Sequence, residues 1–164
     1  MSTEDCNFIK DFQQWFNQTY DFHIKEDGKF HIGFLKAATR AMEREIGTSP
    51  IGHWGEDDKQ NYTIMGLDKD NQVNKTKIVQ ALLAYHGYWS CKIDGIYDER
   101  LKETVSIFQK DNNIAWSGDI GTLTIKKLLS KVHKRAEGEY EPCRKTEAGE
   151  AISEERNEQS GGKA

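Results

Sequence analysis

The feature that most constrains this chain is a tight turn that occurs twice. Asp27-Gly28 and Asp94-Gly95 are each followed by an aromatic residue two positions after the glycine, and then by a run with helical spacing. Glycine adopts the left-handed backbone conformation at little cost, and aspartate bonds back to the local backbone. Each pair therefore predicts a fixed reversal of the chain between two helices.

The residues around the two turns correspond when one Asp-Gly pair is placed over the other, and most aligned positions are apolar in both copies. The aligned pairs are Gln13 with Gln80, Phe16 with Leu83, Phe30 with Tyr97, Phe34 with Leu101, Leu35 with Lys102, Ala38 with Val105 and Met42 with Gln109. Self-similarity of this kind indicates an internal duplication.

Helical periodicity sets the predicted fold class. Apolar residues recur every three or four positions in segments 5–20, 34–46, 75–86, 101–108 and 125–132, with Gly47 as a natural helix stop. Residues 48–74 are rich in turn formers and are expected to form an ordered linker. We predict an all-α protein of two small three-helix modules in tandem, 5–72 and 73–133, followed by a disordered acidic tail, 134–164.

Charge excludes one class of partner. Eight Glu against five Lys or Arg between Arg135 and Ala164 account for −3 of the formal net charge of −4, which leaves the rest of the chain near −1. A nearly neutral body offers no basic face for phosphate backbones. Nucleic acid is therefore not an expected partner.

The cysteines and the first residues of the chain indicate the compartment in which the protein is expected to occur. Cys6, Cys91 and Cys143 are scattered and form no CxxC pair, so we expect unpaired thiols in a reducing environment. No apolar run reaches the roughly 20 residues that span a bilayer, and "MSTEDCNFIK" is acidic rather than a basic export signal. We expect no membrane partner and no signal peptide.

The second copy resembles the peptidoglycan-binding domain of bacterial and phage cell-wall hydrolases. The segments that carry the resemblance are "IVQALLAYHGYW", "DGIYDERLKETVSIFQ" and "NNIAWSGDIGTLTIKKLL". The positions that match the family pattern are Gln80, Leu83, Gly87, Tyr88, Asp94, Gly95, Tyr97, Val105, Phe108, Gln109, Gly118, Ile120, Gly121 and Thr124.

The first copy is similar to the half-module that precedes this domain in lysin tails, through "FIKDFQQWFNQTY", "DGKF", "AATRAMEREIG" and an abbreviated turn, "GHWG". In the family pattern a glycine follows the aromatic residue of the turn. Both copies depart from this pattern, since the residue at this position is His31 in the first copy and Asp98 in the second. Asp98 can still cap the helix that it precedes. His31 is a weaker substitute.

Candidate ligand contacts are the polar and aromatic residues that project beyond the predicted core. A glycan–peptide polymer presents hydroxyls, amides, carboxylates and the apolar faces of sugar rings, which suits a shallow groove with an aromatic platform. The candidates are Tyr88, Trp89, Arg100, Gln109 and Trp116. The two indoles stand out because each lies in a polar setting.

The sequence contains no pattern that predicts catalysis or a metal site. Glu43 and Glu45 fall on the charged flank of a predicted helix, which is unlike the cleft of a lysozyme-type carboxylate pair. The five histidines are dispersed and form no HExxH motif, so neither a metal ligand set nor a cofactor is predicted. Cys91 and His86 are close in sequence but lie on a turn. We predict a protein that is not an enzyme.

Two functions remain open. The chain is interpreted as a non-catalytic peptidoglycan-binding or targeting module, associated with phage or prophage lysis, that acts alone or with a cell-wall hydrolase. It would be cytoplasmic until released and would act at the bacterial wall. The alternative is a protein–protein interaction module with the same fold, such as an assembly or regulatory factor. Fold resemblance alone does not decide between them.

Overall fold

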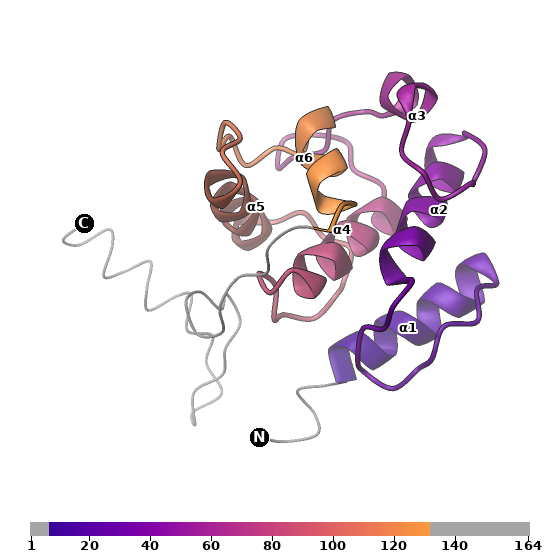
Figure 1. Ribbon diagram of the computed structural model, residues 1–164. Helices are drawn as coiled ribbons and strands as arrows, with labels where there is room; N and C mark the ends of the chain where they lie inside the picture. Colours follow the sequence, from indigo (N-terminus) through magenta and orange to yellow (C-terminus); the bar gives the residue numbers. More distant parts are fainter. Residues whose placement is uncertain (1–6, 132–164) are drawn as a thin grey trace, which may run out of the picture.

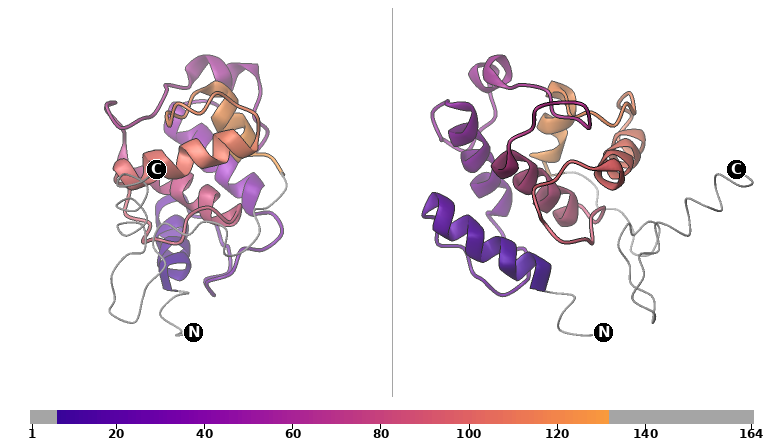
Figure 2. Two further views of the ribbon diagram at one scale, coloured as in Figure 1. Left: turned by 90° about the vertical axis from the view of Figure 1, so that its left-hand side faces the viewer. Right: turned by 180° about the vertical axis from the view of Figure 1, so that it is seen from behind.

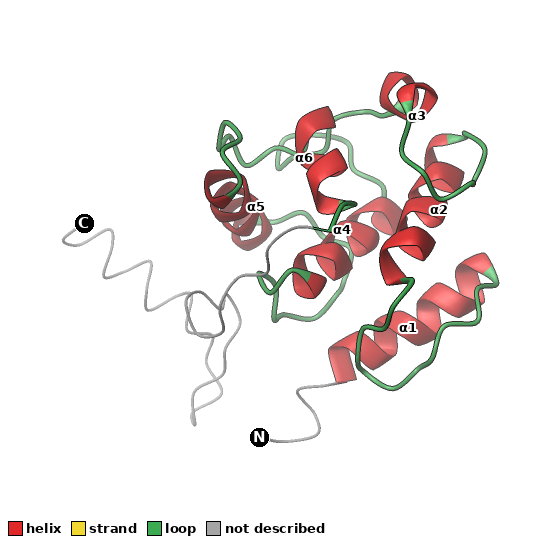
Figure 3. Cartoon of the chain, viewed as in Figure 1, coloured by secondary structure: helices red, strands yellow, loops and turns green. Residues whose placement is uncertain are grey.

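The computed structural model describes residues 7–131, which form six α-helices (Figure 1). The helices are α1 (Asn7–Tyr20), α2 (Phe34–Ile46), α3 (Glu56–Asn61), α4 (Val73–Tyr85), α5 (Glu99–Asp111) and α6 (Thr122–Leu128). Among the described residues there is no strand, only an isolated antiparallel bridge between Met65 and Ile120 (Figure 3). The prediction of a helical protein is confirmed for this part of the chain. The predicted tail, 134–164, lies outside it.

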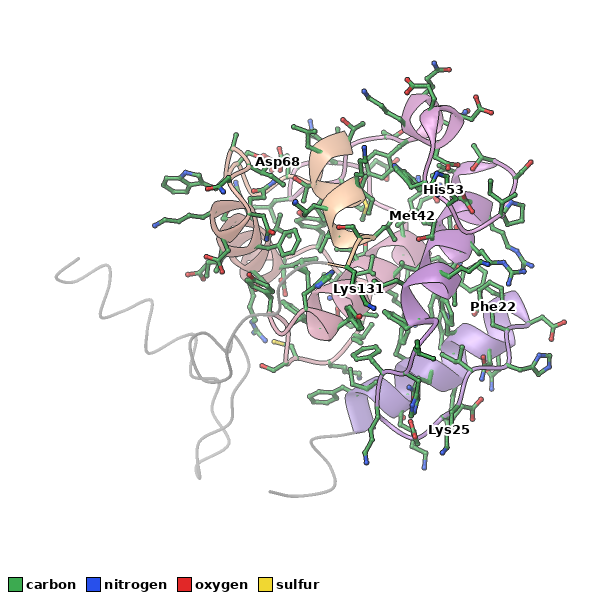
Figure 4. The ribbon with its side chains drawn as sticks, viewed as in Figure 1. Phe22, Lys25, Met42, His53, Asp68 and Lys131 are labelled. Atoms are coloured by element: carbon green, nitrogen blue, oxygen red, sulfur yellow. The ribbon has the colours of Figure 1, made fainter. Side chains whose placement is uncertain are left out.

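Helix α4 is the centre of the fold and contacts α1, α2, α5 and α6, most extensively α2 (Figures 1 and 2). Ile78, Val79, Leu82 and Leu83 of α4 are fully buried. Met42 of α2, labelled in Figure 4, is fully buried in the same core. Because one set of buried side chains runs through both halves of the sequence, the halves share a core.

Aromatic side chains fill the first half of this core. Phe16 stacks on Phe12 with ring centroids 5.1 Å apart, and Phe34 of α2 lies 5.6 Å from Tyr85 of α4. The i, i+4 spacing of Phe12 and Phe16 on α1 is what turns both rings toward the same side of the helix. The contact of Phe34 with Tyr85 joins the first half to the second.

Each Asp-Gly turn is attached to the helix before it by one glutamine. In the second half, Gln80 of α4 accepts the Gly95 backbone N–H at 2.8 Å and donates to the Asp94 carboxylate at 3.0 Å. In the first half, Gln13 of α1 accepts the Gly28 N–H at 2.8 Å and donates to the Lys29 carbonyl at 2.7 Å. Both bonds span fifteen residues, so the aligned glutamines have the same structural role.

A second pair of turns has the same arrangement, but here the bond joins residues that are nine positions apart in the sequence. Gln109 of α5 accepts the Gly118 N–H at 2.9 Å, and Glu43 of α2 accepts the Gly52 N–H at 2.8 Å. All four glycines that donate these bonds have positive φ, between 78° and 87°. The turn between helices therefore occurs four times in the described chain, each time with the same bond.

These bonds correct the alignment of the two halves. They make Glu43 the counterpart of Gln109, whereas the ungapped comparison placed Met42 there. The reason is a longer connection in the first half: α2 begins six residues after Gly28, and α5 begins four residues after Gly95. The extra length shifts the register inside the following helix.

The segment 48–74, expected to be a linker, contains α3 and is packed against the second half. The Tyr62 hydroxyl donates to the Ile120 carbonyl at 2.8 Å, and Met65 exchanges two backbone bonds with Ile120 at 3.1 and 2.7 Å. Burial raises the pKa of Tyr62, so its hydroxyl stays a neutral donor. The sequence signal for α3 was weak because "EDDKQN" has no apolar residue.

We expect Gly95→Ala to destabilise the fold by about 2 kcal/mol. Gly95 has φ of 78°, and an added Cβ would lie 2.6 Å from Cγ1 and 3.1 Å from the carbonyl oxygen of Val73. Urea unfolding of the two proteins measures the difference. Gly121→Ala is the matched control: its φ is −87°, its nearest contact would be 3.9 Å away, and its midpoint should hardly change. Equal losses in both variants would contradict this account of the turn.

Candidate functional site

Three of the five predicted ligand contacts are buried. Gln109 is 1% exposed, and its amide also donates to the Asp119 carbonyl at 2.7 Å and the Thr124 hydroxyl at 2.9 Å. The Tyr88 ring packs on Phe108, and its hydroxyl donates to Asp111 at 2.8 Å. The Trp89 indole N–H donates to the Lys92 carbonyl at 3.3 Å. In this conformation the polar groups of all three serve the turns around α5.

The other two candidates reach the surface but are not brought together. Trp116 is 64% exposed, and the Lys110 ammonium lies 5.5 Å from the centroid of its ring. Arg100 is half-buried near the start of α5, whereas Lys110 is near its end, about 15 Å away along the helix. Trp116 is therefore the candidate that presents an open aromatic face. A ligand role for the five remains a prediction.

Residues of α3 and α6 line a cavity of about 250 Å³. The two helices lie at the same end of the molecule (Figures 1 and 2). The floor and walls of the cavity come from both halves of the chain. The lining residues are Trp54, Gly55, Glu56, Lys59, Thr122, Leu123 and Lys126. Leu123 is 69% exposed, and Trp54 is half-buried against Tyr62, with ring centroids 6.0 Å apart. This cavity combines an indole, an exposed aliphatic side chain and two ammonium groups.

The sequence predicts a turn at Trp54 but indicates no ligand role for this tryptophan. Gly52, in the predicted "GHWG" turn, has φ of 85°. His53, labelled in Figure 4, is exposed on the same loop before α3. No sequence pattern could place Lys126 and Lys59 at one cavity, because that depends on the packing of α3 near α6.

A second cavity, about 280 Å³, lies along the longer turn of the first half and is open to solvent. It is lined mainly by residues 23–25 and 29–34. The charged groups around it are partly paired already: His31 lies 2.8 Å from the Asp27 carboxylate, and the Lys25 ammonium is 3.9 Å from it. His31 therefore bonds to Asp27 across the turn, whereas Asp98 in the second half caps α5 by accepting the Leu101 N–H at 2.9 Å.

The loop that carries Trp54 depends on a buried pair of carboxyl groups. Glu43 is fully buried and Asp58 is 4% exposed, which corrects the expectation that Glu43 lies on a solvated helix flank. Burial is the main reason that the pKa of Glu43 is raised to about 7; the neighbouring Asp58 also raises it, while the bond from the Gly52 N–H lowers it. Asp58 accepts bonds from the Thr48 hydroxyl and, at 2.9 Å, from the Gly55 N–H.

Glu45, also expected on that flank, binds within the protein as well. Its Oε2 accepts the Tyr20 hydroxyl and, at 3.0 Å, the Asn74 amide. The bond to Asn74 ties α2 to the start of α4. Glu45 therefore has a structural role between the two halves.

Cys91 is disulfide-bonded, so the expectation of unpaired thiols is wrong for this residue. The other two cysteines, Cys6 and Cys143, lie outside the described residues. His86 is fully buried, and its Nε2 donates to the Leu128 carbonyl at 2.8 Å. A disulfide sulfur is not a thiolate nucleophile, so the disulfide-bonded Cys91 does not form a Cys–His nucleophile pair with His86.

Within residues 7–131, no three His, Cys, Asp or Glu side chains gather closely enough to hold a metal ion. None of the helices in this range is both long and apolar enough to cross a membrane.

Comparison with known proteins identifies the second half. Residues 72–128 match the family described as "Putative peptidoglycan binding domain". The match begins one residue before α4 and ends with α6, so it covers the turns at Gly95 and Gly118. The matched segment thus contains both glutamine-bonded turns of the second half. This confirms the resemblance predicted from the sequence.

The chain is also similar to the uncharacterized protein FadG of Bacillus subtilis (strain 168). The two are 25% identical over 130 residues, which cover 74% of this chain and 22% of FadG. The chain thus spans about a fifth of the length of this relative. No solved structure matches the chain.

The titration of Glu43 predicts that stability falls as the pH rises from about 4.5 to about 7. In this window the folded protein keeps the Glu43 proton while the unfolded chain, with the ordinary pKa of 4.5, releases it. Because the folded state then binds more protons, the free energy of unfolding falls with pH, by up to about 3 kcal/mol. Denaturant unfolding at pH 5 and pH 8 measures this difference.

Glu43→Gln should remove most of this pH dependence and raise the unfolding free energy at pH 8, because the carboxamide is the group that serves the other three turns. At pH 5 the variant and the parent should be similar. Glu99→Gln, at an exposed position on α5, is the control for loss of a negative charge. A Glu43→Gln protein that is less stable than the parent at pH 8 would refute the raised pKa of Glu43.

Proposed function

We propose that this protein is a non-catalytic module that binds bacterial peptidoglycan. The observation that carries the proposal is the family match over residues 72–128 together with the intact turns inside it. Gln80 and Gln109 each hold a left-handed glycine, and Tyr97 donates to the Gly118 carbonyl at 2.7 Å. The residues that match the family pattern thus form the scaffold on which a binding surface is displayed.

Two features support a tandem arrangement, in which the first half is a degenerate copy of the second. Gln13 and Glu43 bond to Gly28 and Gly52 as Gln80 and Gln109 bond to Gly95 and Gly118. Each half has the order helix, turn, helix, turn, short helix. A second copy next to the first would add contacts to the same polymer, and linked weak sites can raise overall affinity by about 10²–10⁴ when the geometry permits.

The proposed site of action is the bacterial cell wall, reached by release from the cytoplasm as in phage or prophage lysis. The disulfide of Cys91 supports a working environment that is oxidising, as outside the cytoplasm. A cell-wall hydrolase, either free or joined to a module of this kind, is the partner that such targeting would serve. The partial overlap with the longer FadG is compatible with a module in a larger protein.

Trp116 is the proposed contact among the five candidates from the sequence, with Lys110 beside its ring. The exposed indole offers a flat apolar surface to a sugar ring, and the ammonium offers a donor to an acetamido or carboxylate oxygen. Tyr88 bonds to Asp111 at the end of α5, and Gln109 holds the Gly118 turn that follows Trp116. Trp89 bonds to the Lys92 carbonyl in the loop before α5. Arg100 would contact only a ligand long enough to follow the helix.

The purified protein should sediment with sacculi from Gram-positive bacteria. We expect Trp116→Ala to remain folded, because the indole is largely exposed, and to bind sacculi about tenfold more weakly. The bound fraction after centrifugation measures the affinity, and circular dichroism confirms the fold. Ile32→Ala removes an apolar side chain that is 99% exposed in the other half and should bind normally.

Failure of the parent protein to sediment with sacculi of several species would overturn the proposal. A stoichiometric protein partner captured by the same folded chain would then favour the protein-interaction function. Sedimentation of parent and Trp116→Ala to the same extent would leave wall binding in place and remove Trp116 from the contact surface.

A further inference from the structure

The α3–α6 cavity is a composite of both halves of the chain. Trp54, Glu56 and Lys59 come from the first half, outside the segment that matches the peptidoglycan-binding family, and Thr122, Leu123 and Lys126 come from α6. A separate copy of either half would lack one wall. The cavity therefore exists only because the segment that holds α3 is fixed to the second half by the bonds of Tyr62 and Met65 to Ile120.

The charges around the cavity are not neutralised within the described part of the chain. Lys59 and Lys126 make no ion pair with any residue between 7 and 131, and both are exposed. Glu56 is the one carboxylate among the lining residues, so the lining carries a surplus of one positive charge. Two ammonium groups that line one cavity, one from α3 and one from α6, favour an anionic group close to both.

The apolar surface of the cavity has the form of a small platform. Trp54 is held edge-to-face against Tyr62 with an interplanar angle of 77°, which fixes the plane of the indole. Leu123 adds an exposed aliphatic surface from α6. The volume, about 250 Å³, is slightly below the range of about 300–1,000 Å³ for small-molecule sites, so it suits one sugar ring or a short acidic group.

We propose that the α3–α6 cavity binds a carboxylate-bearing glycopeptide unit of the wall, with a sugar ring against Trp54 and the carboxylate between Lys59 and Lys126. This inference rests on the proposed peptidoglycan binding and adds a specific site and ligand chemistry to it. The site differs from the Trp116 surface in its position, since it lies between α3 and α6 and includes residues from both halves. It gives the first half a direct role in recognition.

The test uses the full chain labelled with ¹⁵N and a soluble disaccharide–dipeptide released from sacculi by a muramidase. The indole N–H signals of the four tryptophans are assigned with single Trp→Phe variants and followed by NMR during titration. We expect the Trp54 signal to move and to saturate. The same compound with its carboxylates amidated should bind at least about fivefold more weakly, because it loses the ionic contacts with both lysines.

The double variant Lys59→Gln with Lys126→Gln tests the same ionic contacts by removing the charges of the protein instead of those of the ligand. Both side chains are exposed, so the fold should be retained, and the affinity for the free-acid ligand should fall about fivefold or more. Its affinity for the amidated ligand should stay close to that of the parent. Lys10→Gln with Lys92→Gln removes two exposed charges elsewhere and should leave both affinities unchanged.

The outcomes separate this inference from the proposed function. If the parent sediments with sacculi while the Trp54 signal stays fixed at millimolar ligand, the cavity proposal is overturned and wall binding stands. A ligand that moves only the Trp116 signal also overturns it and places recognition on the other surface. If the parent neither sediments with sacculi nor binds the soluble ligand, the proposed function itself fails.

Discussion

The hydrogen bond from a left-handed glycine to the side chain of the preceding helix is the interaction on which this structure depends. At a tight reversal the glycine N–H points inward and away from water, and an unpaired buried donor costs about 1–3 kcal/mol. Gly95 and Gly118 are buried, and Gln80 and Gln109 accept their N–H groups. Because a carboxamide both accepts and donates, one side chain satisfies the glycine and a second group of the turn.

Glu43 shows what this arrangement requires. At its turn the acceptor atom is retained, since Oε1 bonds to the Gly52 N–H, but Oε2 stands where the carboxamide has its donor nitrogen and makes no hydrogen bond. A proton on Oε2 restores the missing donor beside the Asp58 carboxylate. The raised pKa of Glu43 is thus a consequence of placing an acid in a position built for an amide, and it links the loop of Trp54 to proton concentration.

Most of the helices could be predicted from the sequence, and part of the site could not. Apolar spacing and the glycine stop at Gly47 indicated α1, α2, α4 and α5, because local periodicity is the main determinant of an amphipathic helix. The polar α3 was not predicted, because a six-residue helix that is held by Asp58 and by tertiary contacts has no stripe of apolar residues. The sequence did not predict the burial of Glu43 either, because its charged neighbours Arg44 and Glu45 are typical of a solvent-exposed helix flank.

The prediction of ligand residues depended on a different kind of information. Tyr88 and Trp89 occur in the polar stretch "HGYWSCK", which is a sound reason to expect exposure, but the turn before them folds both rings onto the core of the second half. Burial of a side chain near a turn is decided by the direction of the backbone, which composition does not encode. Trp116 lies in an equally polar stretch and is exposed. Local polarity alone could not separate these cases.

The contact between the halves bears directly on the proposed binding of a polymer. Modules on a flexible linker gain affinity by an effective concentration that depends on linker length. Here α2 packs on α4, Asn74 bonds to Glu45, and Tyr62 bonds to Ile120, so the spacing between the halves is fixed. A fixed spacing avoids the entropy cost of arranging two separate modules, but it restricts binding to ligands whose repeat fits the distance. A cavity shared by both halves follows the same logic, since its shape is as rigid as the interface that creates it.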